Sequence, residues 1–213
     1  MKHLLLLFIV LSFLSSALAT APADLGQGLA YLRVHSLAAD YQSIDAAVRD
    51  SRALVLDLRY IDAPPGSLKT LQDSLARRPA AATLFVLLSP ATPDGLAATL
   101  PANAFTLGIP QLNPAPKITV QQTPAADRQA YDALETGTPL SALITGKIEK
   151  ERYDESSLVQ DFRNGNSNPA PPPLPNPTTG NAAAPPGKVP PPTDRVLQRA
   201  LHLHRALLAL RPR

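Results

Sequence analysis

The stretch Ala53-Leu54-Val55-Leu56-Asp57-Leu58-Arg59 decides the fold that we expect for this chain. Five of its seven residues are apolar, and turn-forming residues lie on both sides, at 50–52 and 62–66. Such a run predicts a short strand that is buried on both faces of a sheet. Asp57 and Arg59 stand at its carboxyl end, where open α/β sheets form their ligand crevices. We expect these two side chains to form salt bridges or to brace the following loop rather than to perform chemistry.

Short apolar strands alternate with amphipathic helices through most of the chain. We expect strands at 28–35, 53–59, 83–88, 104–109 and 118–121, and helices at 41–52, 67–78, 93–100, 125–135 and 140–144. Thr92 is the expected N-cap of the third helix, because Pro93 follows it at the first helical position. This order of elements predicts an α/β fold, in which helices cover both faces of a mostly parallel sheet.

The N-terminal residues 1–19 have the pattern of a secretory signal peptide. A charged start is followed by an apolar run and then by the small residues Ala17 and Ala19 around the expected cleavage site. The apolar run is too short to span a bilayer in the mature protein. We therefore expect an exported protein, periplasmic or extracellular, whose α/β domain covers residues 20–163.

The C-terminal part of the chain changes composition twice. Residues 164–192 are rich in proline and predict a semi-rigid linker without a core of its own. Residues 193–213 follow with an apolar stripe at helical spacing, which predicts an amphipathic helix. That helix must bury its apolar face on its own domain, on a partner protein or on a membrane surface.

Composition narrows the classes of ligand. The chain has no cysteine, which excludes disulfides and thiolate metal sites. His202 and His204 are two residues apart on the expected helix and point in different directions, so we expect no metal site and no cofactor. The basic residues near the C-terminus have no aromatic residues among them, and we expect no nucleic-acid partner. A peptide or protein segment is the partner that we expect, and the oligomeric state is left open.

Taken in order, several segments resemble the tail-specific protease, or C-terminal processing peptidase, family of serine peptidases. Residues 28–34 look like its opening strand, and 53–59 look like its "ALVLDLR" strand, whose following loop usually contains Pro-Gly-Gly and here keeps one glycine, Gly66. Residues 85–100 are similar to the strand and helix start that carry the nucleophile. Residues 117–121 resemble the "KGTVQ" segment, whose lysine is the family's general base. The resemblance covers roughly residues 28–123 and implies a ClpP/crotonase-like sheet.

The resemblance implies a Ser–Lys dyad with Lys117 as the base and the Gly66 loop as a source of oxyanion-binding N–H groups. The family's spacing places Thr92 at the nucleophile position, and matching its helix letters places Ala91 there. Ser89 matches a serine of the pattern that is not catalytic. We therefore expect a catalytically degenerate homologue with a peptide- or protein-binding role. One alternative is an active serine-type endopeptidase that uses Ser89 or Thr92 with Lys117. The other is a scaffold protein that docks through its C-terminal helix.

Overall fold

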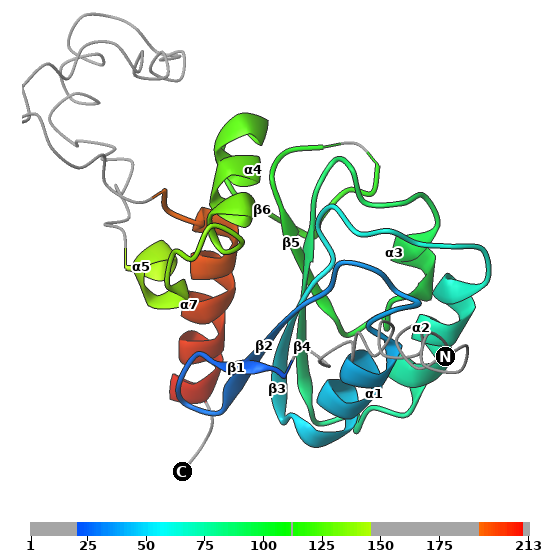
Figure 1. Ribbon diagram of the computed structural model, residues 1–213. Helices are drawn as coiled ribbons and strands as arrows, with labels where there is room; N and C mark the ends of the chain where they lie inside the picture. Colours follow the sequence, from blue (N-terminus) through cyan, green and yellow to red (C-terminus); the bar gives the residue numbers. More distant parts are fainter. Residues whose placement is uncertain (1–20, 112, 146–191, 211–213) are drawn as a thin grey trace, which may run out of the picture.

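A computed structural model describes residues 21–111, 113–145 and 192–210 of the chain. Its fold is α/β, built on one six-stranded sheet in which the strands lie side by side in chain order (Figure 1). β1 runs antiparallel to β2, and all other neighbours are parallel. The strands are β1 (Ala23–Asp24), β2 (Leu29–Arg33), β3 (Ala53–Asp57), β4 (Thr83–Leu88), β5 (Phe105–Gly108) and β6 (Ile118–Thr119).

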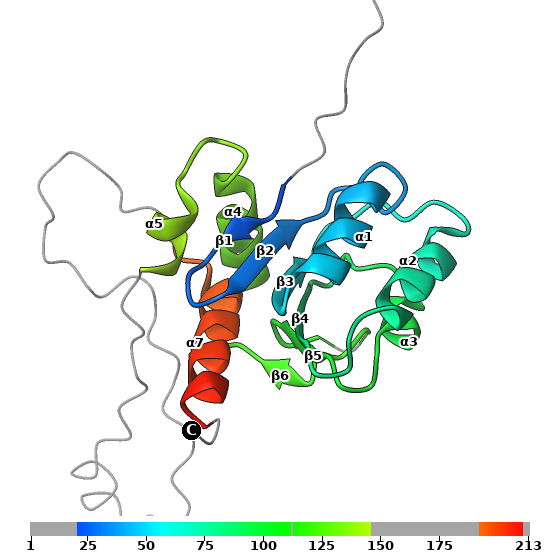
Figure 2. The ribbon, with the colours of Figure 1, turned by 90° about the horizontal axis from the view of Figure 1, so that it is seen from below.

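Helices cover both faces of the sheet. They are α1 (Tyr41–Asp50), α2 (Ser67–Ala76), α3 (Leu96–Thr99), α4 (Pro124–Ala133), α5 (Leu140–Ile144) and α7 (Arg195–Ala209). Figures 1 and 2 show α1, α2 and α3 on one face and α4, α5 and α7 on the other. Each of the first three helices connects two neighbouring parallel strands. Right-handed crossovers that all step in one direction across a sheet place their helices on the same face.

The alternation of side chains along each strand divides the apolar core into two layers. On β3, Leu54 and Leu56 face the layer under α1 and α2, whereas Val55 faces the layer under α7. In the second layer Val55 is paired in register with Tyr31 and Phe85 of the neighbouring strands. All five residues of β3 are buried, as expected for a central strand that is covered on both faces.

The prediction of an α/β fold with a mostly parallel sheet and helices on both faces is confirmed. The expected N-cap role of Thr92 is wrong. The third helix begins at Leu96 after Gly95, which has a left-handed backbone (φ 83°). Residues 89–92 form a hydrogen-bonded turn instead, in which the N–H of Thr92 donates to the carbonyl of Ser89. β1 was not predicted, because a two-residue strand with exposed side chains leaves no periodic pattern.

Helix α7 packs its apolar side on the sheet face opposite α1 and α2. Its residues Val196, Leu197 and Ala200 are fully buried and lie in one cluster with Phe85 of β4. The predicted signal peptide and all of the predicted linker except Pro192 lie outside the described residues. Within the described part of the chain, no helix combines the length and the apolarity that crossing a membrane requires.

Candidate functional site

Ser89 and Thr92 lie together in the turn that follows β4. The Ser89 N–H donates to Thr92 Oγ1 (2.9 Å), and Thr92 Oγ1 donates to the carbonyl of Leu58 (3.3 Å). Ser89 Oγ accepts from the N–H groups of Tyr60 and Ala91, each at 3.3 Å. The exposed fraction is 0% for Ser89 and 4% for Thr92. Both hydroxyls therefore hold the loops after β3 and β4 together and are closed to a substrate.

Lys117 lies away from that turn. Its Nζ donates to the carbonyl oxygens of Ala102 (2.7 Å) and Ala104 (2.9 Å), which precede β5. Leu88 of β4 pairs with Gly108 of β5. Ser89, the residue after Leu88, therefore lies beside Ile109, the residue after Gly108. Ala104 and Ile109 are five residues apart, roughly 16 Å along a strand. The structure thus brings Ser89 and Thr92 together but does not bring Lys117 to them.

Gly66 stands at the end of the loop after β3, immediately before α2. Its backbone is left-handed (φ 83°), a conformation that glycine adopts at little cost, and its carbonyl accepts from the N–H of Thr70 at 3.3 Å. Among the described hydrogen bonds, none joins Gly66 to Ser89 or Lys117. Gly66 shapes the start of α2, which is sufficient to account for a glycine at this position.

A cluster of four buried charged residues occupies the carboxyl end of β3. The Arg59 guanidinium donates from Nε to Asp57 Oδ1 (3.0 Å) and from NH2 to Asp57 Oδ2 (2.8 Å). It also donates to Asp127 Oδ1 (2.8 Å) and to both oxygens of Asp194 (3.3 and 2.7 Å). All four side chains have no exposed surface. All five N–H groups of the guanidinium therefore have acceptors. We call Asp57, Arg59, Asp127 and Asp194 the Arg59 cluster.

The Arg59 cluster joins elements that are far apart in the sequence. Asp57 ends β3, Asp127 lies in the first turn of α4, and Asp194 is the N-cap of α7. Asp194 Oδ1 accepts from the N–H of Leu197 (2.9 Å), which satisfies one free donor at the start of that helix. The cluster therefore fixes where two helices of the second layer begin relative to the sheet.

Two tyrosine hydroxyls also donate hydrogen bonds to carboxylates of the Arg59 cluster. Tyr31 donates to Asp57 Oδ2 (2.9 Å), and Tyr60 donates to Asp127 Oδ2 (2.8 Å). Tyr60 has a left-handed backbone (φ 57°), which is rare for a large side chain. Its N–H bonds Ser89 Oγ while its hydroxyl bonds Asp127, so contacts at both ends hold this conformation.

The electrostatics of the cluster follow from one cation facing three carboxylates. Burial disfavours the charge of Arg59, but Asp194 and Asp57, and then Asp127, outweigh that effect and raise the arginine pKa. Burial raises the pKa of Asp127, against the opposing effects of Arg59 and of the Tyr60 hydroxyl. Asp127 is thus the carboxyl of the cluster whose protonated form is favoured more in the folded protein than in water.

This arrangement predicts a specific pH dependence for Asp127. A carboxyl whose pKa is raised by folding stabilises the folded state most below the usual value of 3.8, and that contribution is lost as pH rises through the folded pKa. The unfolding free energy of the native protein minus that of Asp127→Asn should therefore fall as pH rises from below 3.8 to neutrality. Urea titrations at several pH values measure this difference. The control is Asp94→Asn, which removes a charge from an exposed site. If the unfolding free energy of the native protein minus that of Asp127→Asn rises with pH, the raised pKa of Asp127 is contradicted.

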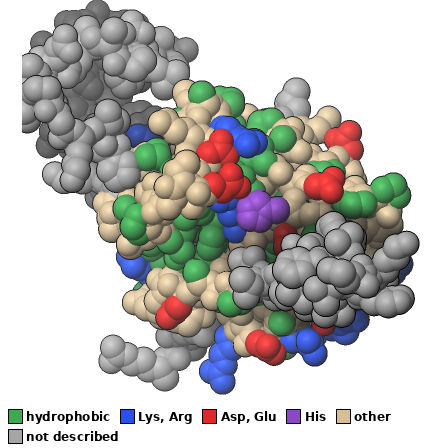
Figure 3. Space-filling view, in the orientation of Figure 1, with side chains coloured by type: hydrophobic (Ala, Val, Ile, Leu, Met, Phe, Trp, Pro, Cys, Tyr) green, Lys and Arg blue, Asp and Glu red, His purple; other side chains and the backbone are tan. Residues whose placement is uncertain are grey.

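Charged side chains of both signs surround the surface next to the cluster. Arg33 NH2 donates to Glu135 Oε1 (2.9 Å), and its Cζ lies 3.6 Å from the ring centre of Tyr131. His35 Nε2 lies 3.4 Å from the same Glu135 oxygen. Figure 3 shows acidic and basic side chains interspersed on this face. The face in view thus has no extended basic patch of the kind that nucleic acids bind.

The sequence identified half of this site. Asp57 and Arg59 were expected to form salt bridges or to brace the following loop, with no partner named; both form salt bridges, and they pair with each other, but the roles of Asp127 and Asp194 were not predicted. The available signals were weak: Asp194 opens an amphipathic helix, and Asp127 follows the Thr123-Pro124 helix start. Neither signal indicates a partner 68 or 135 residues away in the chain.

The arrangement has a structural role that leaves little capacity for chemistry. Arg59 lies among the three carboxylates, in the position that a metal ion would need, and within the described ranges no group of three or more candidate ligands is placed to hold one. Comparison of the chain with protein-family models, with curated proteins and with solved structures finds no match.

Proposed function

We propose that this chain is an exported, catalytically inactive relative of the tail-specific peptidases, with a ClpP/crotonase-like sheet that binds a peptide or protein segment. Residues 1–19 direct its export to the periplasm or the medium. The observation that carries the proposal is the position of Lys117, whose Nζ bonds the carbonyls of Ala102 and Ala104. A general base has to lie within hydrogen-bond reach of its nucleophile.

The burial of Ser89 and Thr92 supports the same proposal. A nucleophile must meet the scissile carbonyl, yet both hydroxyls are closed off in a turn that bonds the neighbouring loop. The resemblance to the family falls on residues that form the sheet, whereas the departures fall on residues that would perform the chemistry. A fold retained without its catalytic residues is compatible with a binding role.

An exposed sheet edge is the proposed place for an extended peptide. β6 is the outermost strand on its side of the sheet among the described strands, and it has a single strand neighbour, β5. A peptide can add to such an edge through backbone hydrogen bonds, with pockets for alternate side chains giving specificity. The proposed partner is therefore an extended segment of another chain.

The alternative of an active serine-type endopeptidase requires a large rearrangement. Lys117 would have to leave both carbonyls and approach Ser89 or Thr92, which would have to become exposed. In the other alternative, a partner protein would bind the apolar side of α7. That side already packs on the sheet, where Val196, Leu197 and Ala200 are buried. Neither alternative is favoured by a specific contact.

A peptidase assay tests the proposal. The secreted chain, without residues 1–19, should release no product from casein or from fluorogenic peptides above the buffer rate. Lys117→Ala should leave that result unchanged and lower the unfolding free energy by about 1 kcal/mol, the typical contribution of such hydrogen bonds. Ser89→Ala is the matched variant at the other position. Clear turnover by the native chain that either substitution abolishes would contradict the proposal.

A further inference from the structure

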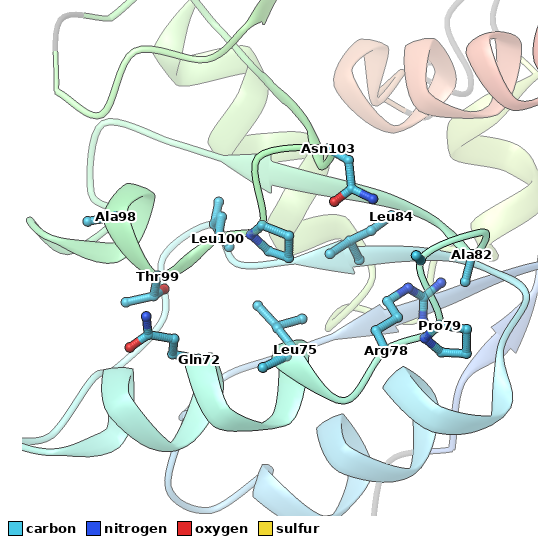
Figure 4. Close-up of a pocket in the computed structure, with 13 residues that line it drawn as sticks. Gln72, Leu75, Arg78, Pro79, Ala82, Leu84, Ala98, Thr99, Leu100 and Asn103 are labelled. Carbon is cyan, nitrogen blue, oxygen red and sulfur yellow. The ribbon is translucent and has the colours of Figure 1, made fainter.

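A cavity of about 360 Å³ lies between α2 and α3, next to the amino ends of β4 and β5 (Figure 4). Its size falls within the range of small-molecule sites. Thirteen residues line it, and none is acidic. In Figure 4, Leu75, Leu84 and Leu100 lie between a polar end with Gln72 and Thr99 and a second end with Arg78. The lining is thus an apolar middle with a cation at one end.

Arg78 is the charged group of this cavity. Its NH1 donates to the carbonyl of Val48 (2.8 Å), and its NH2 donates to the carbonyl of Thr83 (2.7 Å). Two carbonyls fix the guanidinium without neutralising it, and within the described ranges no carboxylate lies within salt-bridge distance of it. Its Nε is buried and unpartnered. One N–H on each terminal nitrogen is left over for a ligand.

Lys117 does not line the cavity but bonds residues next to its lining. Its Nζ bonds the carbonyls of Ala102 and Ala104, and the neighbouring residues Pro101 and Asn103 line the cavity. Within the described part of the chain Lys117, like Arg78, forms no salt bridge. Among the described residues, Arg78 is the only charged one that lines this cavity, and a cation beside an apolar surface favours an anion with an apolar body over a neutral or cationic ligand.

We propose that this cavity binds a carboxylate on a short apolar chain, with the carboxylate at Arg78 and the apolar part against Leu75, Leu84 and Leu100. The two sources of that chemistry are a free short-chain carboxylic acid and the C-terminal residue of a peptide. The site does not depend on the proposed function, because it lies at the amino ends of the strands, whereas Ser89 and the Arg59 cluster lie at the carboxyl ends.

Calorimetric titration of the secreted chain with matched ligands tests the chemistry. Octanoate is the probe for the free acid, and 1-octanol and octylamine share its chain without its negative charge. A dipeptide ending in leucine, compared with its C-terminal amide, is the probe for a chain terminus. We expect binding of the free acid, the free dipeptide or both, and at least about tenfold weaker binding of each matched compound, because a hydrogen-bonded charge is lost. Which of the two acids binds more tightly identifies the source.

Substitutions locate the site. Arg78→Gln should weaken binding of the carboxylate by about tenfold to a hundredfold. The matched control is Arg77→Gln, which removes a neighbouring charge that is bonded to Asp45 and does not line the cavity. Asn103→Trp places a large side chain at an exposed lining position and leaves Arg78 itself unchanged. If Arg78→Gln does not fold, this second variant tests the site. Equal binding of octanoate and 1-octanol, no binding of either acid, or full binding by Asn103→Trp would overturn the proposal.

Discussion

Replacing Arg59 with methionine should lower the unfolding free energy of the protein by at least about 3–5 kcal/mol. The guanidinium holds Asp57, Asp127 and Asp194 in a site without solvent contact, and the substitution leaves three carboxylates there without a cation. Removing one partner of a buried ion pair costs about 3–5 kcal/mol. A domain of this size has a total stability of about 5–15 kcal/mol, so this loss removes a large share of the stability and shifts the urea midpoint well below that of the native chain.

The matched control for this substitution is Arg128→Met. Arg128 bonds Asp132 (2.8 Å) as an exposed pair one helical turn apart. Such a pair contributes about 0–1 kcal/mol, and the contact of Arg128 with the Tyr60 ring (4.5 Å) contributes about 0.5–1 kcal/mol, so this variant should lose no more than about 2 kcal/mol. Circular dichroism during urea titration measures both variants. Similar, small losses for the two substitutions would show that the Arg59 cluster does not hold the fold together.

Placing an aspartate at Ala200 should have the second large effect. Ala200 is fully buried between α7 and the sheet, so Ala200→Asp either places an unpaired charge in an apolar layer or separates the helix from it. A buried, unpaired charge costs several kcal/mol. The loss of α7 would also expose the layer beneath it, which contains Val55, Phe85 and Leu107.

Ala206→Asp is the control on the same helix. It makes the same chemical change at an exposed position, so helix propensity and net charge change equally while burial does not. We expect a loss of less than about 1 kcal/mol. Thermal unfolding followed by circular dichroism compares the two, and size-exclusion chromatography reports whether the molecule expands. Native-like unfolding of Ala200→Asp would mean that α7 is not part of the core in solution.

Local pattern was sufficient to predict five of the six strands of the sheet. The strand at Ala53–Asp57 is apolar, short and bounded by turn residues, and those properties depend on neighbours in the sequence alone. The prediction that Thr92 caps a helix was wrong because residues 89–92 form a turn. In that turn the Thr92 hydroxyl bonds Ser89 and Leu58 rather than the start of a helix.

The site could be predicted only in part, because its contacts are long-range. Charged residues at the end of a buried strand predicted salt bridges for Asp57 and Arg59, but the sequence did not name their partners. Asp127 and Asp194 reach the same guanidinium from helices on the second face of the sheet. Their positions depend on how α4 and α7 return across the sheet, and periodicity contains no information on that.

The proposals on function and on the cavity concern opposite ends of the sheet. At the carboxyl ends, the Arg59 cluster and the hydroxyls of Ser89 and Thr92 are buried and hold neighbouring loops and helices together. At the amino ends, Arg78 retains a charge without a carboxylate beside a cavity. A binding role therefore agrees with the geometry at both ends.

The most direct test of the central claim is a reaction of the chain without residues 1–19 with a serine-reactive fluorophosphonate, followed by peptide mass spectrometry. An activated hydroxyl forms a covalent adduct with such a probe, whereas a buried hydroxyl without a base does not. The account predicts no adduct on Ser89 or Thr92, in the native chain and in Lys117→Ala alike. An adduct on either residue that disappears in Lys117→Ala would contradict it.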